Sequence, residues 1–243
     1  MEDLLMGSFL SAMATGAGAL PILFFKTVTH RWRDILLAFT AGIMMAAATI
    51  SLIPQALNQD SFIIVCLGVM TGVLVLTLLE SIIPHIDLEH KHRNLSMDTQ
   101  ALLVLSAITL HNIPEGLSVG VSYSSDQNEL GGLIAFAIGL QNAPEGFLVA
   151  LFLINQRVSR WKAFFLAMMT GSVEIVSAIC GYYLTNIVDG LVPYGLSFAA
   201  GAMLFIVYKE LIPESHGDGH AGAATLSFIA GLLVMIGLTE WLK

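Results

Sequence analysis

The sequence repeats one polar hexapeptide inside two apolar stretches, LSAITLHNIPEGLSVGV at residues 105–121 and AFAIGLQNAPEGFLVAL at residues 135–151. The repeated units are HNIPEG, which begins at His111, and QNAPEG, which begins at Gln141. In a helix the first residue and the Glu of each unit are four apart and share a face, while the Asn lies about 100° around the axis. Each stretch therefore predicts a helix that presents a wedge of donor groups, with imidazole, amide and carboxylate in the first and two amides and a carboxylate in the second.

The rest of the chain is similarly apolar. Hydrophobic residues make up 56% of the 243 residues and charged residues 12%, whereas about a quarter of a typical soluble domain is charged. A bilayer span needs about 20 apolar residues, and we find eight such segments, at 4–25, 35–57, 62–84, 101–121, 130–154, 163–186, 191–212 and 222–242. They lack the alternation of barrel strands. We predict an all-α protein of the lipid bilayer with eight transmembrane helices in a single domain, 1–243.

Basic residues mark one side of this predicted membrane protein. Nine of the ten Lys and Arg residues follow or end the first, third, fifth and seventh segments, and only Lys243 lies on the other side. Cytoplasmic loops carry the excess of Lys and Arg, so we expect a multi-pass cell-membrane protein with both termini outside the cytoplasm. Ten basic residues form no exposed cluster suited to nucleic acid, and we expect no nucleic-acid partner.

The two halves of the chain resemble each other. FTAGIMMAAATISLIP from Phe39 matches FAAGAMLFIVYKELIP from Phe198, and AMATG from Ala12 matches AMMTG from Ala167. The matched spans cross the membrane in opposite directions, which predicts an inverted repeat of spans one to three and six to eight around the central spans four and five. Spans three and eight show only weak similarity.

The polar units lie at the predicted middle of the membrane. His111 and Gln141 are ten and eleven residues into their spans, a depth of about 15 Å at 1.5 Å per residue. Glu174 lies at a similar depth in the sixth span. Pro114 and Pro144 each remove a helical hydrogen bond, so we expect helices broken at mid-depth. Carboxylates there cost about 2.5 kcal/mol or more each, and three of them together predict a bound cation.

The donor types indicate the class of cation. Imidazole, carboxylate and amide groups together suit zinc and other first-row divalent ions, whereas magnesium and calcium prefer all-oxygen sets. Shared carboxylates leave open whether one or two ions bind. In the alternative interpretation, Pro and Gly only kink the helices and the polar groups bond between neighbouring helices. Two copies with Glu at matching depth favour the metal site.

HNIPEG and QNAPEG, in an eight-span chain with outer termini and a His-bearing loop, resemble the ZIP (Zrt/Irt-like) family of divalent metal transporters, prokaryotic type. The resemblance covers essentially the whole chain. It implies uptake of zinc, with cadmium, iron, manganese and cobalt as further candidates, across the cell inner membrane, and it implies no cofactor. It assigns the metal to His111, Asn112, Glu115, Gln141, Asn142, Glu145, Glu174 and Met44. Glu210 resembles an exit-path carboxylate, but Lys209 stands where a histidine is expected, which puts a relay site there in doubt.

Several alternatives stay open at this level. A channel-like pore and a carrier differ in gating, which the residues do not reveal. An intramembrane metalloenzyme would show HExxH or a similar histidine pair, and none occurs in any segment, so we expect no enzyme. The cytoplasmic loop 85–99 contains His85, His90 and His92 without tetrahedral spacing, and it is either simply solvated or a weak metal-capture segment. A homodimer is left open.

Overall fold

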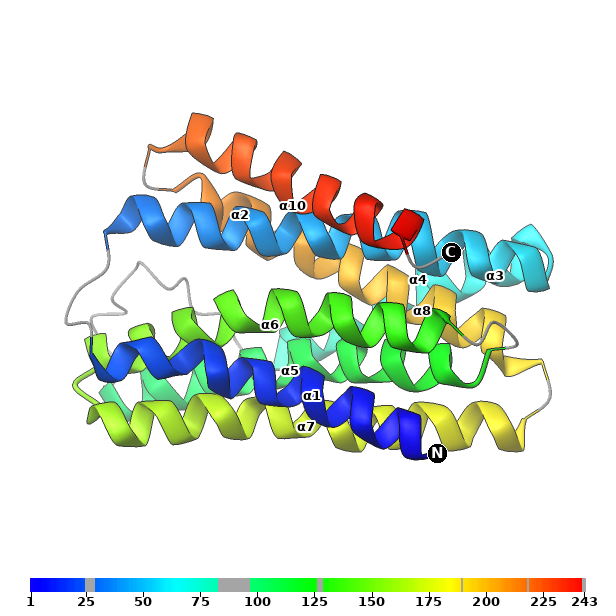
Figure 1. Ribbon diagram of the computed structural model, residues 1–243, viewed down its shortest axis with the longest axis horizontal. Helices are drawn as coiled ribbons and strands as arrows, with labels where there is room; N and C mark the ends of the chain where they lie inside the picture. The colour runs from blue at the N-terminus through cyan, green and yellow to red at the C-terminus, as the bar shows by residue number, and fades with distance from the viewer. Residues whose placement is uncertain (25–28, 83–96, 126–128, 189, 218, 242–243) are drawn as a thin grey trace.

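The computed structural model describes residues 1–24, 29–82, 97–125, 129–188, 190–217 and 219–241, and within these ranges every regular element is a helix (Figure 1). Eight spans in the described residues are long and apolar enough to cross a membrane. In chain order they are α1 (Glu2–Ala19) with η1 (Leu20–Leu23), α2 (His30–Ala46) with η2 (Ala47–Leu52) and α3 (Ile53–Gln59), α4 (Phe62–Ile82), α5 (Met97–Tyr123), α6 (Leu130–Asn155), α7 (Arg160–Ile187), α8 (Leu191–Ile206) with η3 (Val207–Leu211) and α9 (Ile212–Ser215), and α10 (Ala221–Trp241). The predicted all-α, eight-span fold is confirmed.

Two of the helices, α2 and α5, begin well before the apolar segments that predict them. α2 starts at His30 rather than at residue 35, and α5 starts at Met97, so residues 97–99 of the predicted loop 85–99 are helical. The remainder of that loop, together with its histidines, lies outside the described residues. A helix satisfies its own backbone hydrogen bonds and can continue past the hydrocarbon with polar side chains, which hydropathy alone does not detect.

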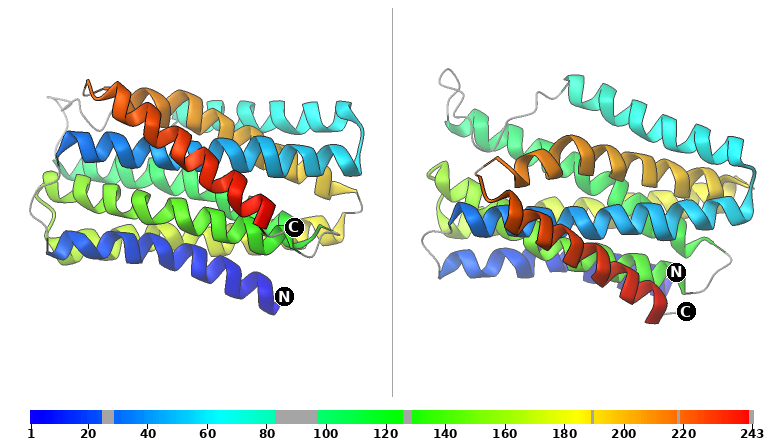
Figure 2. Two further views of the ribbon diagram at one scale, coloured as in Figure 1. Left: turned by 45° about the horizontal axis from the view of Figure 1, so that its top comes forward. Right: turned by 90° about the horizontal axis from the view of Figure 1, so that it is seen from above.

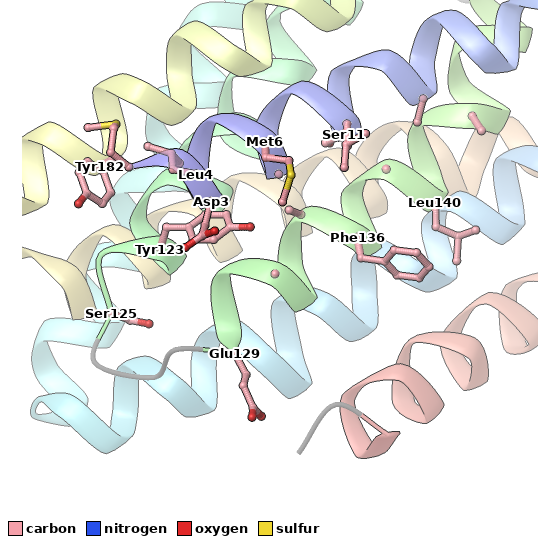
Figure 3. Close-up of a pocket in the computed structure, with 18 residues that line it drawn as sticks. Asp3, Leu4, Met6, Ser11, Tyr123, Ser125, Glu129, Phe136, Leu140 and Tyr182 are labelled. Atoms are coloured by element: carbon pink, nitrogen blue, oxygen red, sulfur yellow. The ribbon is translucent and has the colours of Figure 1, made fainter.

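The spans form two layers (Figures 1 and 2). The α5–α6 layer contains α1, α5, α6 and α7, in which α1 packs on α6 and α7, and α5 packs on α7. The α2–α8 layer contains α4, α8, α2 and α10, and its strongest pairs are α2 with α10 and α4 with α8. The layers meet where α5 and α6 contact α8 and α2. Fully buried apolar side chains, including Ile43, Met203, Ile134 and Ile138, belong to the core that joins them.

Glycines set the close approach of helices within each layer. A Cβ on Gly42 of α2 would overlap the Phe228 carbonyl of α10, and a Cβ on Gly201 of α8 would overlap the Val69 carbonyl of α4. Among the described glycines, each one whose Cβ would lie within 3.0 Å of another helix's backbone makes that contact inside its own layer. Small residues that let backbones meet are a common basis of helix association in membranes. The α5–α6 layer and each helix pair of the α2–α8 layer are therefore packed backbone to backbone.

The same glycine contacts reveal the inverted repeat. Gly231 of α10 packs on the Phe39 carbonyl, and Gly72 of α4 packs on the Phe198 carbonyl. Phe39 and Phe198 are equivalent positions of the matched sequences, and α2 and α8 run in opposite directions (Figure 1). The α2–α10 and α8–α4 pairs are thus two copies of one unit. This makes α4 equivalent to α10, the pair whose sequences are only weakly similar.

The prediction of helices broken at Pro114 and Pro144 was wrong. α5 and α6 continue through both prolines. A single lost hydrogen bond is tolerated in a membrane helix when neighbouring helices pack around it, and both helices are held on several sides.

π-Helical turns occur instead in the two repeated spans of the α2–α8 layer, those of α2 and α8. The segments η2 and η3 are π-helical, and each ends directly before the short helix that carries Pro54 or Pro213. π-helical turns inside longer helices are rare and are frequent at functional sites. The turn η3 contains Lys209 and Glu210.

The bundle has two distinguishable ends. α1 begins and α10 ends at the same end, as an even number of spans requires (Figure 2). We call it the terminal end. The opposite end, where α2 and α7 begin, holds Arg31, Arg33, Arg160 and Lys162. We call it the basic end.

Candidate metal site

The two hexapeptides meet inside the bundle, on the contacting helices α5 and α6. His111 and Glu115, one helical turn apart on α5, line a cavity of about 70 Å³ that is also lined by Glu145 of α6 and Met44 of α2. The cavity has room for an ion and a few water molecules. From there its lining extends along α8, η3 and α9 toward the basic end, through Ile206, Glu210, Leu211 and Glu214.

Glu115 is completely buried. Its Oε1 accepts a hydrogen bond from Nε2 of Gln141, the first residue of the second hexapeptide. Its Oε2 and the Gln141 Oε1 are buried, and the described residues offer neither of them a hydrogen-bond donor. Buried polar atoms are nearly always partnered, so two adjacent oxygens without donors indicate a place for a cation or water.

A second polar cluster joins α7, α6 and α1. Nδ2 of Asn142 donates to both carboxylate oxygens of Glu174, at 2.8 and 2.9 Å, and Oγ of Ser11 donates to Glu174 Oε2 at 2.8 Å. All three side chains are buried. The Asn142 Oδ1 lacks a donor within the described part of the chain. The Asn142 Nδ2 group therefore holds the Glu174 carboxylate in place, and the Asn142 Oδ1 remains available to an ion.

The third contact lies closer to the basic end. His111 Nε2 is 2.9 Å from Glu210 Oε2, a carboxylate of the π-helical turn η3. This contact joins the α5–α6 layer to the α2–α8 layer. Glu145 lies within electrostatic range of both His111 and Glu210, and its Oε1 is buried without a donor from the described residues. The His111 imidazole therefore lies beside the mid-membrane carboxylates and also contacts Glu210, which lines the part of the cavity that leads toward the basic end.

The final glycine of each hexapeptide brings the outer helices close. A Cβ on Gly116 would overlap the backbone of Glu174 on α7, and a Cβ on Gly146 would overlap the Thr15 carbonyl on α1. The preceding Glu of each unit points elsewhere, into the cavity region. The Pro-Glu-Gly end of each copy thus combines a carboxylate with the contact that positions the neighbouring helix. Sequence alone suggested only kinking for these glycines.

Three buried carboxylates make this region electrostatically suited to a cation. Glu115 lies within electrostatic range of Glu145 and Glu174, and all three are held in the middle of apolar spans. Like charges close together in a low dielectric are costly unless they are paired. Across the described chain, no three His, Cys, Asp or Glu side chains already converge on one metal position. The carboxylates are instead divided among amide, hydroxyl and imidazole partners.

The predicted site residues are brought to one region by the fold. Met44, His111, Glu115 and Glu145 line the cavity, Gln141 bonds Glu115, and Asn142 bonds Glu174. Asn112 is buried beside them, and its Nδ2 has no acceptor among the described residues.

Sequence reasoning missed Ser11 and Thr40, and it named Glu210 without predicting its contact with His111. Ser11 is one of many small polar residues in apolar spans, and nothing in its local sequence marks it. Thr40 lines the cavity one turn before Met44. Glu210 was set apart as an exit-path carboxylate, yet it contacts His111 directly. The repeated Leu-Ile-Pro after η2 and η3 was the signal that could have drawn attention to Glu210.

Comparisons with known proteins identify relatives of the whole chain. Residues 85–239 match the family model described as ZIP Zinc transporter. The chain is 36% identical over 243 residues to the zinc transporter GufA of Myxococcus xanthus, covering 96% of each protein. It is 33% identical over 242 residues to the zinc transporter ZIPB of Bordetella bronchiseptica, covering 95% of this chain and 78% of that one. It is also 28% identical over 244 residues to the zinc transporter ZupT of Streptococcus mutans, covering 93% and 92%.

Proposed function

The chain belongs to the ZIP family of zinc transporters, and from this premise we propose that it takes zinc into the cytoplasm through the polar region of α5, α6 and α7. Membership makes the protein a multi-pass membrane transporter of metal ions rather than an enzyme. One observation carries the finer proposal: four buried oxygens on the two hexapeptides receive no donor from the residues that the structure describes. They are Glu115 Oε2, Gln141 Oε1, Asn142 Oδ1 and Glu145 Oε1.

The proposed ligand set selects for a borderline-soft divalent ion. His111 offers an imidazole and Met44 a thioether on the cavity wall, and the remaining donors are carboxylate and amide oxygens. Imidazole and sulfur favour zinc and its first-row neighbours over magnesium and calcium. When the ion arrives, Glu115 and Glu145 turn toward it. The ion then offsets the like charge that now makes these carboxylates costly.

His111 connects binding to release in this proposal. Its Nε2 either binds the ion or contacts Glu210, because one nitrogen cannot do both at once. Rotation toward Glu210 therefore loosens the ion and leaves the cavity path toward the basic end as its exit. By the excess of Lys and Arg, the basic end faces the cytoplasm, and the terminal end, with both termini, faces outward.

Movement between the layers supplies alternating access. Glycine contacts between backbones join the four helices of the α5–α6 layer and each of the pairs α2–α10 and α4–α8, whereas the glycine contacts described between the layers meet side chains. Sliding of one layer against the other preserves the backbone contacts at the glycines. It changes only the side-chain contacts between the layers. The mid-membrane carboxylates lie on helices of the α5–α6 layer, whereas Met44 and Glu210 lie in the α2–α8 layer. A relative shift of the layers therefore changes the ligand set.

Flux into proteoliposomes tests the proposed cargo. The purified protein should carry zinc, and more slowly one or more of cadmium, iron, manganese and cobalt, with saturable kinetics; a flux that does not saturate would favour a pore. His111→Ala should reduce zinc affinity by about 10- to 100-fold, because it removes the imidazole but leaves the amides in place. Thr225→Ala, an exposed change on α10, is the matched control. Unchanged zinc kinetics in His111→Ala would remove this residue from the site.

Cysteine labelling tests the orientation. In a Cys66→Ala/Cys180→Ala background, single cysteines replace Glu129, at the terminal end, and Ser159, at the basic end; both positions are exposed. A membrane-impermeant maleimide applied to intact cells should label position 129 and spare position 159 until the cells are opened. The opposite pattern would reverse the proposed direction of the termini.

A further inference from the structure

An ion pair lies beside the proposed exit path, and the functional site as described so far makes no use of it. Lys209 of η3 pairs with Glu80, near the end of α4 at the basic end. The Lys209 ammonium also lies 5.1 Å from the centre of the Phe205 ring. The ammonium side chain is 48% exposed, whereas the Glu80 side chain is only 17% exposed. The carboxylate is thus held inside the protein, and its counter-ion approaches from the surface.

Glu80 shares a small cavity with the exit-path residues. A space of about 20 Å³ is lined by Glu80, His111 and Glu210, with Leu76, Ala107, Leu110 and Phe205 as its apolar walls. That volume holds about one water molecule or one ion. His111 and Glu210 also line the larger cavity, so both spaces border the two residues of the His111–Glu210 contact. An imidazole and two carboxylates around one ion-sized space would be a strong zinc-binding combination.

The charge balance shows what Lys209 changes. With Lys209 paired to Glu80, the two carboxylates and the ammonium carry a net charge of −1, and the ammonium occupies the Glu80 carboxylate. Without the ammonium the carboxylates carry −2, which neutralises a divalent ion. The affinity of carboxylate sites for divalent ions depends strongly on the ligand charge, and the ammonium and the metal would compete for the same Glu80 oxygens.

We propose that Lys209 is a positioning residue that keeps Glu80 from joining His111 and Glu210 as a third metal ligand, so that the exit path holds its cargo loosely. This inference rests on the proposed function, because it assumes that the ion leaves past His111 and Glu210. The ammonium serves as a built-in substitute for the ion. The π-helical turn η3 places Lys209 toward Glu80 and the next residue, Glu210, toward His111.

The test measures equilibrium binding of Cd²⁺ in a Glu115→Gln/Glu145→Gln background, which removes the mid-membrane carboxylates and leaves the exit path. Lys209→Met in this background should bind Cd²⁺ at least about tenfold more tightly than the background protein. Adding Glu80→Gln should return the affinity to the background value. Lys209→Arg, which retains the charge, should stay at the background value, and Lys209→Gln serves as a second neutral variant if Lys209→Met does not fold.

Two results would overturn the inference. Binding by both neutral variants that is no tighter than the background would show that Glu80 does not reach the ion. Tight binding that persists after Glu80→Gln would show that Lys209 acts by simple repulsion. A merely structural ion pair would lower the unfolding temperature equally in Lys209→Met and Glu80→Gln without changing Cd²⁺ affinity. The proposed function is tested separately, since its failure would appear as absent zinc flux in the parent chain.

Discussion

Zinc flux through a Glu115→Gln/Glu145→Gln double variant should fall at least about a hundredfold, because losing a metal's supporting groups costs roughly 10- to 100-fold each. The substitution keeps the shape of both side chains and lets position 115 still accept a hydrogen bond from Gln141. It also relieves repulsion between buried carboxylates, so the protein should remain folded and its unfolding temperature should not fall. Metal flux in proteoliposomes and thermal unfolding in detergent measure the two properties.

The matched control for this variant is Glu129→Gln, which removes an exposed carboxylate outside the cavity. It should transport zinc at the parental rate. If the double variant also transports near that rate, the two hexapeptides are a polar packing cluster, and the site assignment fails. If the double variant transports no zinc and is also unfolded, the carboxylates are needed for structure. Single variants must then separate their role in folding from their role in metal binding.

Gly42→Ala and Gly201→Ala should each destabilise the protein by about 1–3 kcal/mol, the usual cost of overpacking. The new methyl group would overlap a backbone carbonyl of the neighbouring helix in both cases, and a backbone cannot move aside as a flexible side chain can. Because these glycines are equivalent in the inverted repeat, the two losses should be similar. Unfolding temperature in detergent is the measurement.

Gly237→Ala is the control for this pair. A Cβ at Gly237 of α10 meets nothing within 4 Å, and Ala is a better helix former than Gly by about 1 kcal/mol. This variant should therefore be as stable as the parent or slightly more so. Gly42→Ala and Gly201→Ala proteins that resemble Gly237→Ala would contradict the close backbone contacts, and with them the repeat as described.

The number and kind of spans could be predicted from the sequence because the bilayer imposes a length on every apolar segment. Within a membrane the backbone must satisfy its hydrogen bonds locally, so an apolar run of sufficient length is a helix. The donor types could be predicted as well, since Glu115, Glu145 and Glu174 in apolar spans are too costly to be incidental. The spacing of each hexapeptide already placed its first residue and Glu on one face.

The pairing of helices could not be predicted in this way. Most spans are apolar on all sides, so their pattern does not distinguish a face that meets lipid from one that meets another helix. The equivalence of α4 and α10 became visible only when Gly72 and Gly231 were seen against matching carbonyls. Pro114 and Pro144 suggested breaks that the surrounding helices prevent.

The sequence by itself therefore determined an eight-span fold and indicated a metal transporter, and it predicted a His, Glu and amide site at mid-membrane. Only the tertiary structure decided which donors are neighbours. Ser11 meets Glu174 across 163 positions, and Glu80 meets Lys209 across 129. Helix rotation and layer packing determine such contacts, and no local periodicity records them. The physical reason is that depth in the membrane follows from position along one helix, whereas contact depends on the relative placement of two.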